Sequence, residues 1–491
     1  SIGAIASLFL QILLLLTGGT RKWNRPCRLI AWSSYSMSDF VAILVLGGLA
    51  QNAALSGKTI YAIWAPMLLL HLGAPDNISA YATEDSELWL RHGFTVLLQI
   101  ASAMYIVASC VTPWRYALVS LCLLAAGSIK SAERTLALHH ASKSAIKESA
   151  LTIFEFMRLE PFIAQMIHAE REESPPQSEQ RFTYHYVLTG EHQWHRNFLH
   201  LSNAYDGPEE EEDEPGFEAV KRTPQLVTLH DVLSSRELAP THHVVLMCVG
   251  FSLFKLYRRR LVSLYMYEWR QTAKTPRFFS TNPIFRTVKD LAFVLDVELR
   301  FIFDSLYTKA AGTAFTKLGV AFRIVTTLFL IVSAFFLLSP DMKLRDQEKL
   351  VKEAESITFL LLAAAITVEA YQLTRLALSD WTKVWLACIY IRMKKDIDRQ
   401  THSDPNCGFK IAMQNWVRAG ILEMIRVEDS IARHKYWNSR IGQYAMRGEI
   451  HVENDALYNC RRRGEFGINN KLCNLWHNLI LHSRFGKWIL Q

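Results

Sequence analysis

Apolar segments separated by strongly charged stretches constrain this chain more than any other feature of its sequence. A helix that spans a bilayer needs roughly 20 mainly apolar residues, and six or seven segments come close to that length. They are Ile2–Thr17, Asp39–Leu55, Ile60–Leu72, His92–Cys110, Tyr116–Ile129, Phe315–Leu338 and Ile357–Leu378. Ile60–Leu72 is short and contains Pro66, so a kinked span and a re-entrant segment both fit it. The pattern predicts a mainly α, polytopic helical membrane protein with about seven spans.

Basic residues beside these segments predict their orientation, because cytoplasmic loops are enriched in Lys and Arg. The basic flanks are Arg21, Lys22, Arg25 and Arg28, then Lys130, Arg134, Lys143 and Lys147, and finally Arg392, Lys394, Lys395 and Arg399. If all three flanks are cytosolic, the N-terminus lies outside, the C-terminus is cytosolic and Ile60–Leu72 must cross. The sequon Asn77-Ile78-Ser79 would then stay unglycosylated in a cytosolic loop. We expect a multi-pass integral membrane protein of the plasma membrane or an endomembrane.

The composition excludes several classes of protein. Half of the 491 residues are hydrophobic and only 20% are charged, which excludes a disordered chain and a collagen-like chain. The eight cysteines form no C-x-x-C pair, so neither a structural zinc site nor a disulfide-stapled secreted module has support. The net charge of +8 flanks the apolar segments. It is therefore interpreted as membrane topology, and no nucleic-acid partner is expected.

The charged stretches predict two helical cytosolic portions between and after the membrane segments. The expected regions are 1–130 with about five spans, 131–313 with an acidic loop near 205–218, 314–382 with two spans, and a C-terminal domain at 383–491. Within the second region, Val244–Phe254 is apolar but too short to span, and it leads into Arg258, Arg259 and Arg260. It fits an amphipathic helix whose basic residues lie at the membrane surface, and it equally fits a buried core helix.

Short phrases spread along the chain resemble one family of plant proteins. They include Trp64-Ala65-Pro66, the stretch 78–92, Phe254-Lys255-Leu256 and the stretch 378–386. On these phrases the chain resembles plant multi-pass membrane proteins of unknown function that carry a DUF4220 domain, followed by a partial DUF594-type C-terminal domain. The His-, Thr- and Asp-containing segment expected of the second domain is not found before Gln491. The resemblance implies a plant membrane protein and brings no established reaction.

An acidic group beside one span is the first candidate for function. The acidic stretch consists of Asp76, Glu84, Asp85 and Glu87. A helix that began near Ser79 would put Glu84 and Glu87 on the same face as Arg91. Acids beside a span can form a mouth that attracts cations. They can equally form salt bridges, or complement the dipole of the helix that they begin.

Glu369 is the second candidate, because it lies deep in the last apolar segment. A lone carboxylate there costs roughly 3 kcal/mol unless it is paired or hydrated. Arg323 and Lys317 in the preceding segment could pair with it, whereas Arg375 is poorly placed on the same helix. The sequence therefore leaves two interpretations of Glu369, a pore-lining carboxylate and a member of an interhelical ion pair.

Catalytic motifs were searched for without success. The sequence contains no H-E-x-x-H, no Walker loop, no G-x-S-x-G and no Rossmann glycine fingerprint, so an enzyme has little support. The pair His192-x-x-His195 has no acid or thiol at a suitable spacing, so no metal and no cofactor are expected. The first hypothesis is an oligomeric ion channel or channel-like conduit with cytosolic regulatory regions. The alternative is a membrane-anchored scaffold or signalling protein that docks protein partners through its cytosolic helices. Both hypotheses place the chain in a lipid membrane, and the first requires a homo-oligomer.

Overall fold

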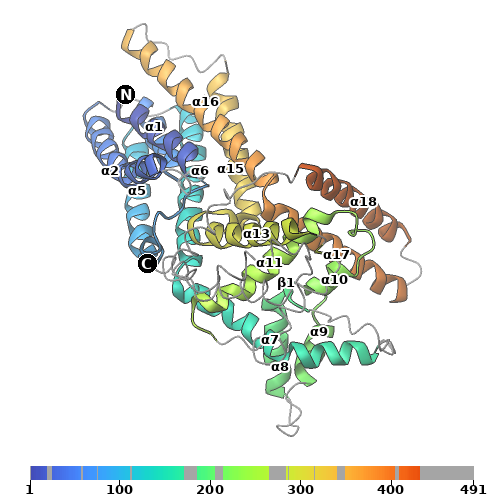
Figure 1. Cartoon of the computed structure of the whole chain (residues 1–491). Coiled ribbons are helices and arrows are strands. Elements are labelled where there is room, and N and C mark those ends of the chain that lie inside the picture. Colours follow the sequence, from blue (N-terminus) through green and yellow to red (C-terminus); the bar gives the residue numbers. More distant parts are fainter. Residues whose placement is uncertain are drawn as a thin grey trace, which may run out of the picture. The chain divides into compact units, whose positions relative to one another are not determined.

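A computed structural model describes the chain as a mainly helical protein, as the sequence predicts (Figure 1). The described residues are 2–18, 25–56, 59–73, 76–110, 113–170, 185–204, 214–264, 284–285, 287–314, 316–339, 349–403 and 408–431. The chain divides into two compact units. Unit 1 comprises Ser1–Ser142 and Phe303–Thr382, and unit 2 comprises Lys143–Ile302 and Lys383–Gln491. The predicted acidic loop near 205–218 lies largely outside the described residues.

Unit 1 contains the apolar helices. Its elements are α1 (Ile2–Thr17), α2 (Arg25–Ser56), α3 (Thr59–Gly73), α4 (Thr83–Glu87), α5 (Trp89–Ser109), α6 (Trp114–His140), α14 (Ala310–Ala314), α15 (Lys317–Leu338) and α16 (Lys349–Ala377). Five helices, α2, α5, α6, α15 and α16, are long and apolar enough to cross a membrane. By length and composition they make the chain a multi-pass integral membrane protein. The predicted number of about seven is not confirmed, because α1 and α3 are shorter apolar helices.

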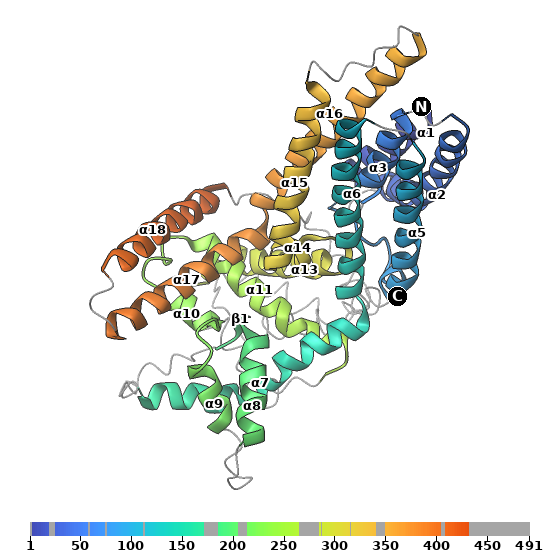
Figure 2. The ribbon, with the colours of Figure 1, turned by 180° about the vertical axis from the view of Figure 1, so that it is seen from behind.

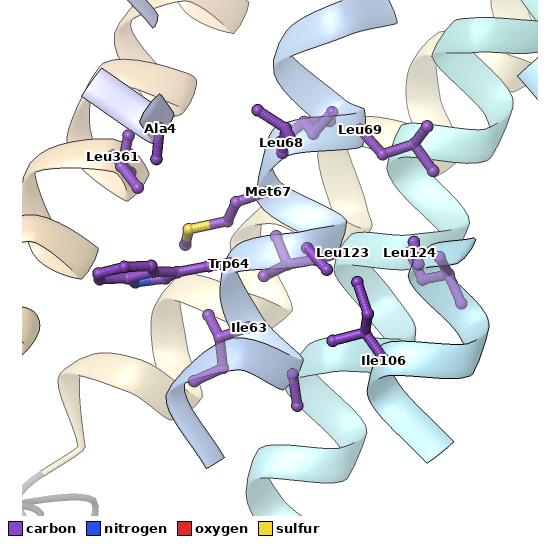
Figure 3. Packing of buried hydrophobic residues seen from close by; sticks show 14 of the residues in the cluster. Ala4, Ile63, Trp64, Met67, Leu68, Leu69, Ile106, Leu123, Leu124 and Leu361 are labelled. Carbon is purple, nitrogen blue, oxygen red and sulfur yellow. The ribbon is translucent and has the colours of Figure 1, made fainter. Parts of the chain in front are cut away.

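Helix α3 forms the centre of unit 1. Every residue from Ala62 to Gly73 is buried, and Pro66 is accommodated within the helix. Figure 3 shows Trp64 and Met67 among side chains from several neighbouring helices. The indole Nε1 of Trp64 donates a hydrogen bond of 2.9 Å to Oγ1 of Thr358 in α16. Since lipid is as apolar as these side chains, van der Waals packing around α3 rather than removal from water holds the helices together.

The closest packing joins α3 and α6, which run side by side in unit 1. A Cβ atom at Gly127 would lie 2.9 Å from the backbone nitrogen of Leu70. A Cβ atom at Gly73 would lie 2.8 Å from the carbonyl carbon of Lys130. Glycine at both positions therefore lets the two backbones touch, as small residues do between membrane helices. Figure 2 shows α15 running alongside α6 from behind, and the two helices are in contact.

Unit 2 is a helical body with one small sheet. Its elements are α7 (Lys143–Glu170), β1 (Val187–Thr189), α8 (Glu191–Ala204), α9 (Glu214–Lys221), β2 (Val227–Thr228), α10 (Leu229–Leu233), α11 (His242–Leu261), α13 (Val288–Tyr307), α17 (Asp380–Ser403) and α18 (Gly408–Ile431), with the ends of α13 and α17 assigned to unit 1. The strands pair antiparallel, with Val187 opposite Thr228. Every residue of α11 from Val244 to Tyr257 is buried. Of the two interpretations of this segment, the buried core helix is therefore the one observed.

Ion pairs hold the elements of unit 2 together. Lys255 of α11 lies 2.6 Å from Glu191 at the start of α8. On α17, Lys395 lies 2.7 Å from Asp231, and Lys394 lies 2.9 Å from Glu237. The basic residues that follow the last apolar segment therefore attach α17 to the loops around α10, in addition to any role in orientation.

Candidate functional site

A cluster of buried charges in unit 1 is the candidate functional site. We define the charge network as Asp76, Lys130, Glu133, Lys309, Arg323, Glu369 and Gln372. Its members come from α6, α15, α16 and the segments next to α3 and α14. Lys130, Lys309 and Glu369 are each no more than 3% exposed, so water reaches them poorly. Three cationic and three anionic groups balance one another within the network.

Glu369 is paired on two sides. Its carboxylate forms a close ion pair with Lys130 of α6, and Arg323 Nη1 of α15 lies 3.6 Å from Glu369 Oε1. The amide oxygen of Gln372, one turn further along α16, accepts hydrogen bonds from Lys130 at 3.1 Å and from Arg323 at 3.3 Å. These contacts join α6, α15 and α16. The structure therefore places Glu369 inside an ion-pair network between these three helices.

The other end of the charge network lies where α3 ends. Arg323 Nη2 is 2.7 Å from Asp76 and 3.7 Å from Glu133. Lys309 donates hydrogen bonds to the carbonyl oxygens of Gly73 and Lys130, and its Nζ lies 3.9 Å from Asp76. Lys309 thereby binds the end of α3 and the second half of α6 to the segment that precedes α15.

Burial and neighbouring charges act in opposite directions on the groups outside the apolar helices. Burial lowers the pKa of Lys309 to about 8, although Asp76 and Glu133 oppose that shift. Burial alone would raise the pKa of Asp76, but Arg323 and Lys309 outweigh it and hold that pKa below its usual value. Asp76 is therefore a stable anion, whereas Lys309 titrates near the upper end of the physiological range.

Several polar atoms of the charge network have no hydrogen-bond partner among the described residues. They include both carboxylate oxygens of Glu133, Oδ1 of Asp76, Oε1 of Glu369 and Nε of Arg323. Buried polar atoms are normally hydrogen-bonded, and ordered water or an ion fills the gap when protein groups do not. The described residues therefore leave part of the hydrogen-bonding capacity of Glu133, Glu369 and Arg323 unused.

A small polar cavity lies beside the network, between α1, α2, α3 and α6. Gln11, Tyr35, His71 and Arg134 contribute to its lining, and its volume of about 10 Å³ is close to the minimum that holds one water molecule. Both amide atoms of Gln11 and Nε2 of His71 are buried without a hydrogen-bond partner in the described structure. Arg134 lies 3.3 Å from Asp39 of α2 and stacks over the Tyr35 ring at 5.2 Å.

Three acids of the predicted mouth lie in the short helix α4 and do not belong to the charge network. Glu84 and Glu87 are exposed, and Asp85 accepts hydrogen bonds from the backbone nitrogens of Tyr81 at 2.9 Å and Ala82 at 3.1 Å. Asp85 therefore caps α4. Because α4 ends at Glu87 and α5 begins at Trp89, these acids and the exposed Arg91 do not share the single continuous helix that the sequence suggested.

The predicted basic residues are distributed among different environments. Arg323 belongs to the charge network, Arg375 is exposed on α16, and Lys317 begins α15 with a side chain outside the described part of the structure. In α11, Arg259 is fully buried, Arg258 lies half-buried over the Phe254 ring at 5.9 Å, and Arg260 is exposed. A fully buried guanidinium cannot face a lipid surface, so Arg259 does not fit the predicted membrane-surface group.

Sequence reasoning missed most of the charge network. Lys130 is expected only as part of a basic flank and Asp76 only as part of the acidic stretch beside a span, while Glu133 and Lys309 are not among the candidate site residues. One signal was present, because Lys130 and Glu133 follow an apolar run at a spacing that puts both on one helical face. The partners on α15 and α16 lie about two hundred residues further along the chain, and only the fold brings them together.

Comparison with known proteins gives one match. The family model described as "Domain of unknown function (DUF4220)" matches residues 32–447 of the chain. No curated protein and no solved structure matches it.

Proposed function

Because the chain belongs to the DUF4220 family, whose description names no activity, we propose its function from its own geometry. We propose an oligomeric, gated conduit for small ions that is closed in the conformation described above. Unit 1 forms the membrane part, and unit 2 is a cytosolic regulatory part. The observation that carries the proposal is the charge network, in which Glu369 is bound by Lys130 and Arg323.

The proposal includes seven crossings, with α1 and α3 as the two short ones. Asn77 donates hydrogen bonds to the carbonyl oxygens of Leu14 and Leu15, so the loop after α3 lies at the end of α1. Lys309, before α15, binds the end of α3. These contacts support an arrangement in which the apolar helices alternate in direction. Lys130 and Arg134 lie on α6 close to the end of α3, and by the positive-inside rule we place this end of the helices, and the C-terminus, in the cytosol.

The energetics of buried charges support a role beyond packing. Replacing a buried ion pair by apolar residues of similar volume is often neutral or stabilising. Ionisable groups within membrane segments therefore mark pathways for ions or protons more often than they contribute stability. The oxygens of Glu133, which have no hydrogen-bond partner among the described residues, leave hydrogen-bonding capacity for water or an ion at the same place. In the proposed open state, Glu369 separates from Lys130 and becomes available to a passing cation.

Ion flux through purified protein in liposomes tests the proposal. The variants Glu369→Gln and Lys130→Met should each change the flux at least several-fold relative to the wild type, because each removes one side of the closing ion pair. Glu84→Gln is the matched control, since it removes an exposed carboxylate of the same unit. Absence of flux from the wild type and from all three variants, over a range of voltage and pH, would refute the conduit.

A second candidate is the membrane-anchored scaffold. It is favoured by the burial of Glu369 in ion pairs and by unit 2, which is a compact body with its own buried helix α11. On this hypothesis the charge network only fixes the helices of unit 1. The scaffold would be favoured over the conduit by two results together. Glu369→Gln would give the same ion flux per folded molecule as the wild type, and a protein partner would bind to unit 2 in stoichiometric amount.

A further inference from the structure

Helix α18 of unit 2 has two apolar faces, and only one of them packs against other residues that the structure describes. The inner face packs toward α11, with Ile425 1% exposed and Ile421 and Leu422 half-buried. Arg418 holds the helix from the side, because its guanidinium lies over the Tyr390 ring at 5.7 Å. A surface helix with one such face is fully explained by packing on its own unit. The outer face requires another explanation.

The outer face carries large apolar side chains in contact with solvent. Trp416 is 78% exposed, and the others are between 39% and 57% exposed, namely Met413, Val417, Met424 and Val427. Single exposed apolar residues are ordinary, whereas a contiguous stripe of them marks an interaction surface. Met and Trp are also among the residues enriched in interfaces between proteins.

The spacing of this stripe is that of a helix which pairs with another helix. Met413, Val417, Gly420, Met424 and Val427 follow one another at intervals of four, three, four and three residues. That alternation keeps one seam facing a partner helix, as in coiled coils. A helix that lies on a lipid surface needs no such regular seam, because lipid has no holes to fill.

Gly420 stands at the centre of the seam. A Cβ atom there would meet nothing within 4 Å, so no neighbour in the described structure requires a glycine. Glycine within a helix is unfavourable by about 1 kcal/mol relative to alanine. At the middle of an apolar seam it allows a second backbone to approach closely. This position therefore indicates that the partner is a helix that crosses α18 at Gly420.

The charges along α18 indicate which helix that is. The first half of the helix carries Lys410 and Arg418. In the second half Glu423 and Arg426 pair with each other at 2.5 Å, which leaves the acids Glu428 and Asp429. An antiparallel copy of α18 would therefore bring a basic half against an acidic half at both ends. With Gly420 on the two-fold axis, Met413 would face Val427 of the second copy, and Trp416 would face Met424.

We propose that α18 pairs antiparallel with α18 of a second copy and makes the protein a homodimer. A two-fold contact is self-complementary, which the central Gly420 and the opposite charges of the two halves provide. One pair of helices is a small interface, but both copies are held in one membrane and meet at a high effective concentration. The inference is independent of whether the protein conducts ions.

Cysteine cross-linking of the full chain in lipid nanodiscs or liposomes tests the pairing. Gly420→Cys places two thiols on the axis, and a disulfide needs Cα atoms about 4.4–6.8 Å apart. It should form a disulfide-linked dimer at least tenfold more than Asn415→Cys, which is an exposed control on another side of α18. In mixtures, Met413→Cys should cross-link to Val427→Cys more than to itself, because the pairing is antiparallel.

The oligomeric state gives a second readout that does not depend on added thiols. The wild type should be a dimer at the protein concentrations found in membranes. The double variant Trp416→Ser/Met424→Ser should be a folded monomer, because both side chains are exposed and contribute little to the fold of unit 2. A wild-type monomer, equal cross-linking of Gly420→Cys and Asn415→Cys, or self-cross-linking of Met413→Cys would each overturn the proposal. If truncation after residue 431 turned a monomer into a dimer, the outer face of α18 would instead be covered by the chain's own later residues. If brominated lipid quenched the fluorescence of Trp416, the outer face would instead contact the membrane.

Discussion

The ion pair between Lys130 and Glu369 gives the sharpest prediction about the fold of unit 1. Removing one member of a buried pair leaves the other charge uncompensated, which destabilises a protein by about 3–5 kcal/mol. In Lys130→Met, Glu369 keeps Arg323 at 3.6 Å, a distance at which two unit charges still attract by roughly 4–5 kcal/mol at an effective dielectric constant near 20. We therefore expect a loss at the lower end, about 3 kcal/mol.

Glu369→Gln should cost a similar amount, because it leaves Lys130 buried with a surplus positive charge. The double variant is neutral again, and we expect it to be more stable than either single variant. For a unit of this size each kcal/mol lowers the midpoint of thermal unfolding by about 2–4 °C, so the single variants should unfold about 6–12 °C early.

Thermal unfolding in one detergent, followed by tryptophan fluorescence, measures all four proteins of this cycle. The control is Glu84→Gln, which should stay within about 0.5 kcal/mol of the wild type because Glu84 is exposed. An unfolding temperature of the single variants equal to that of this control would refute the expected loss of stability. The pairing is equally refuted if the loss in the double variant equals the sum of the single losses, since the two charges would then not interact.

Three further predictions concern other parts of the chain. Burial raises the pKa of Glu298 in α13 to about 8, above its unfolded value of 4.5, so the protein should lose stability as the pH rises between these two values. In urea unfolding of the full chain at pH 5 to 8, Glu298→Gln should reduce this dependence of stability on pH. Asn77 uses its side-chain amide to bind the end of α1, so mass spectrometry of protein from a glycosylating host should find it unmodified, and Asn77→Ala should destabilise unit 1 by about 1 kcal/mol. Gly127→Leu should destabilise unit 1 by more than about 3 kcal/mol because its side chain meets the α3 backbone, whereas Gly47→Leu, where a Cβ atom meets nothing within 4 Å, should be tolerated in the same thermal assay.

The sequence predicts the helices of this protein well and their contacts poorly. Each apolar segment named from the sequence corresponds to a helix, because length and hydropathy are local properties. The burial of α3 was not foreseen, since its apolar composition looks the same for a helix in lipid and a helix in protein. The distinction depends on Gly73 and Gly127, which bring α6 against it, and on Trp64, which binds α16.

The candidate site shows the same limit. Glu369 and Arg323 could be singled out because charges are rare within apolar segments. Lys130 looked like an ordinary flanking residue, because a positive charge at the end of a span is common and signals orientation. Its pairing with Glu369 depends on how α6 and α16 pack, which is not encoded in any local pattern. Asp85 was misleading for a related reason, since an acid near a span is also the usual way to cap a short helix.

The central position of α3 has a consequence for the order of synthesis. At about 1.5 Å per residue, its 15 residues extend roughly 22 Å, less than the hydrocarbon thickness of about 30 Å. It leaves the ribosome before α6 and α16, which later cover it. α1, α2, α5 and α6 are made before it or soon after it, whereas α16, whose Thr358 binds Trp64, is complete only after some three hundred further residues, so the nascent chain carries an incompletely covered short helix until then. Completion of α16, rather than emergence of α3 itself, is thus the step at which the membrane unit can close.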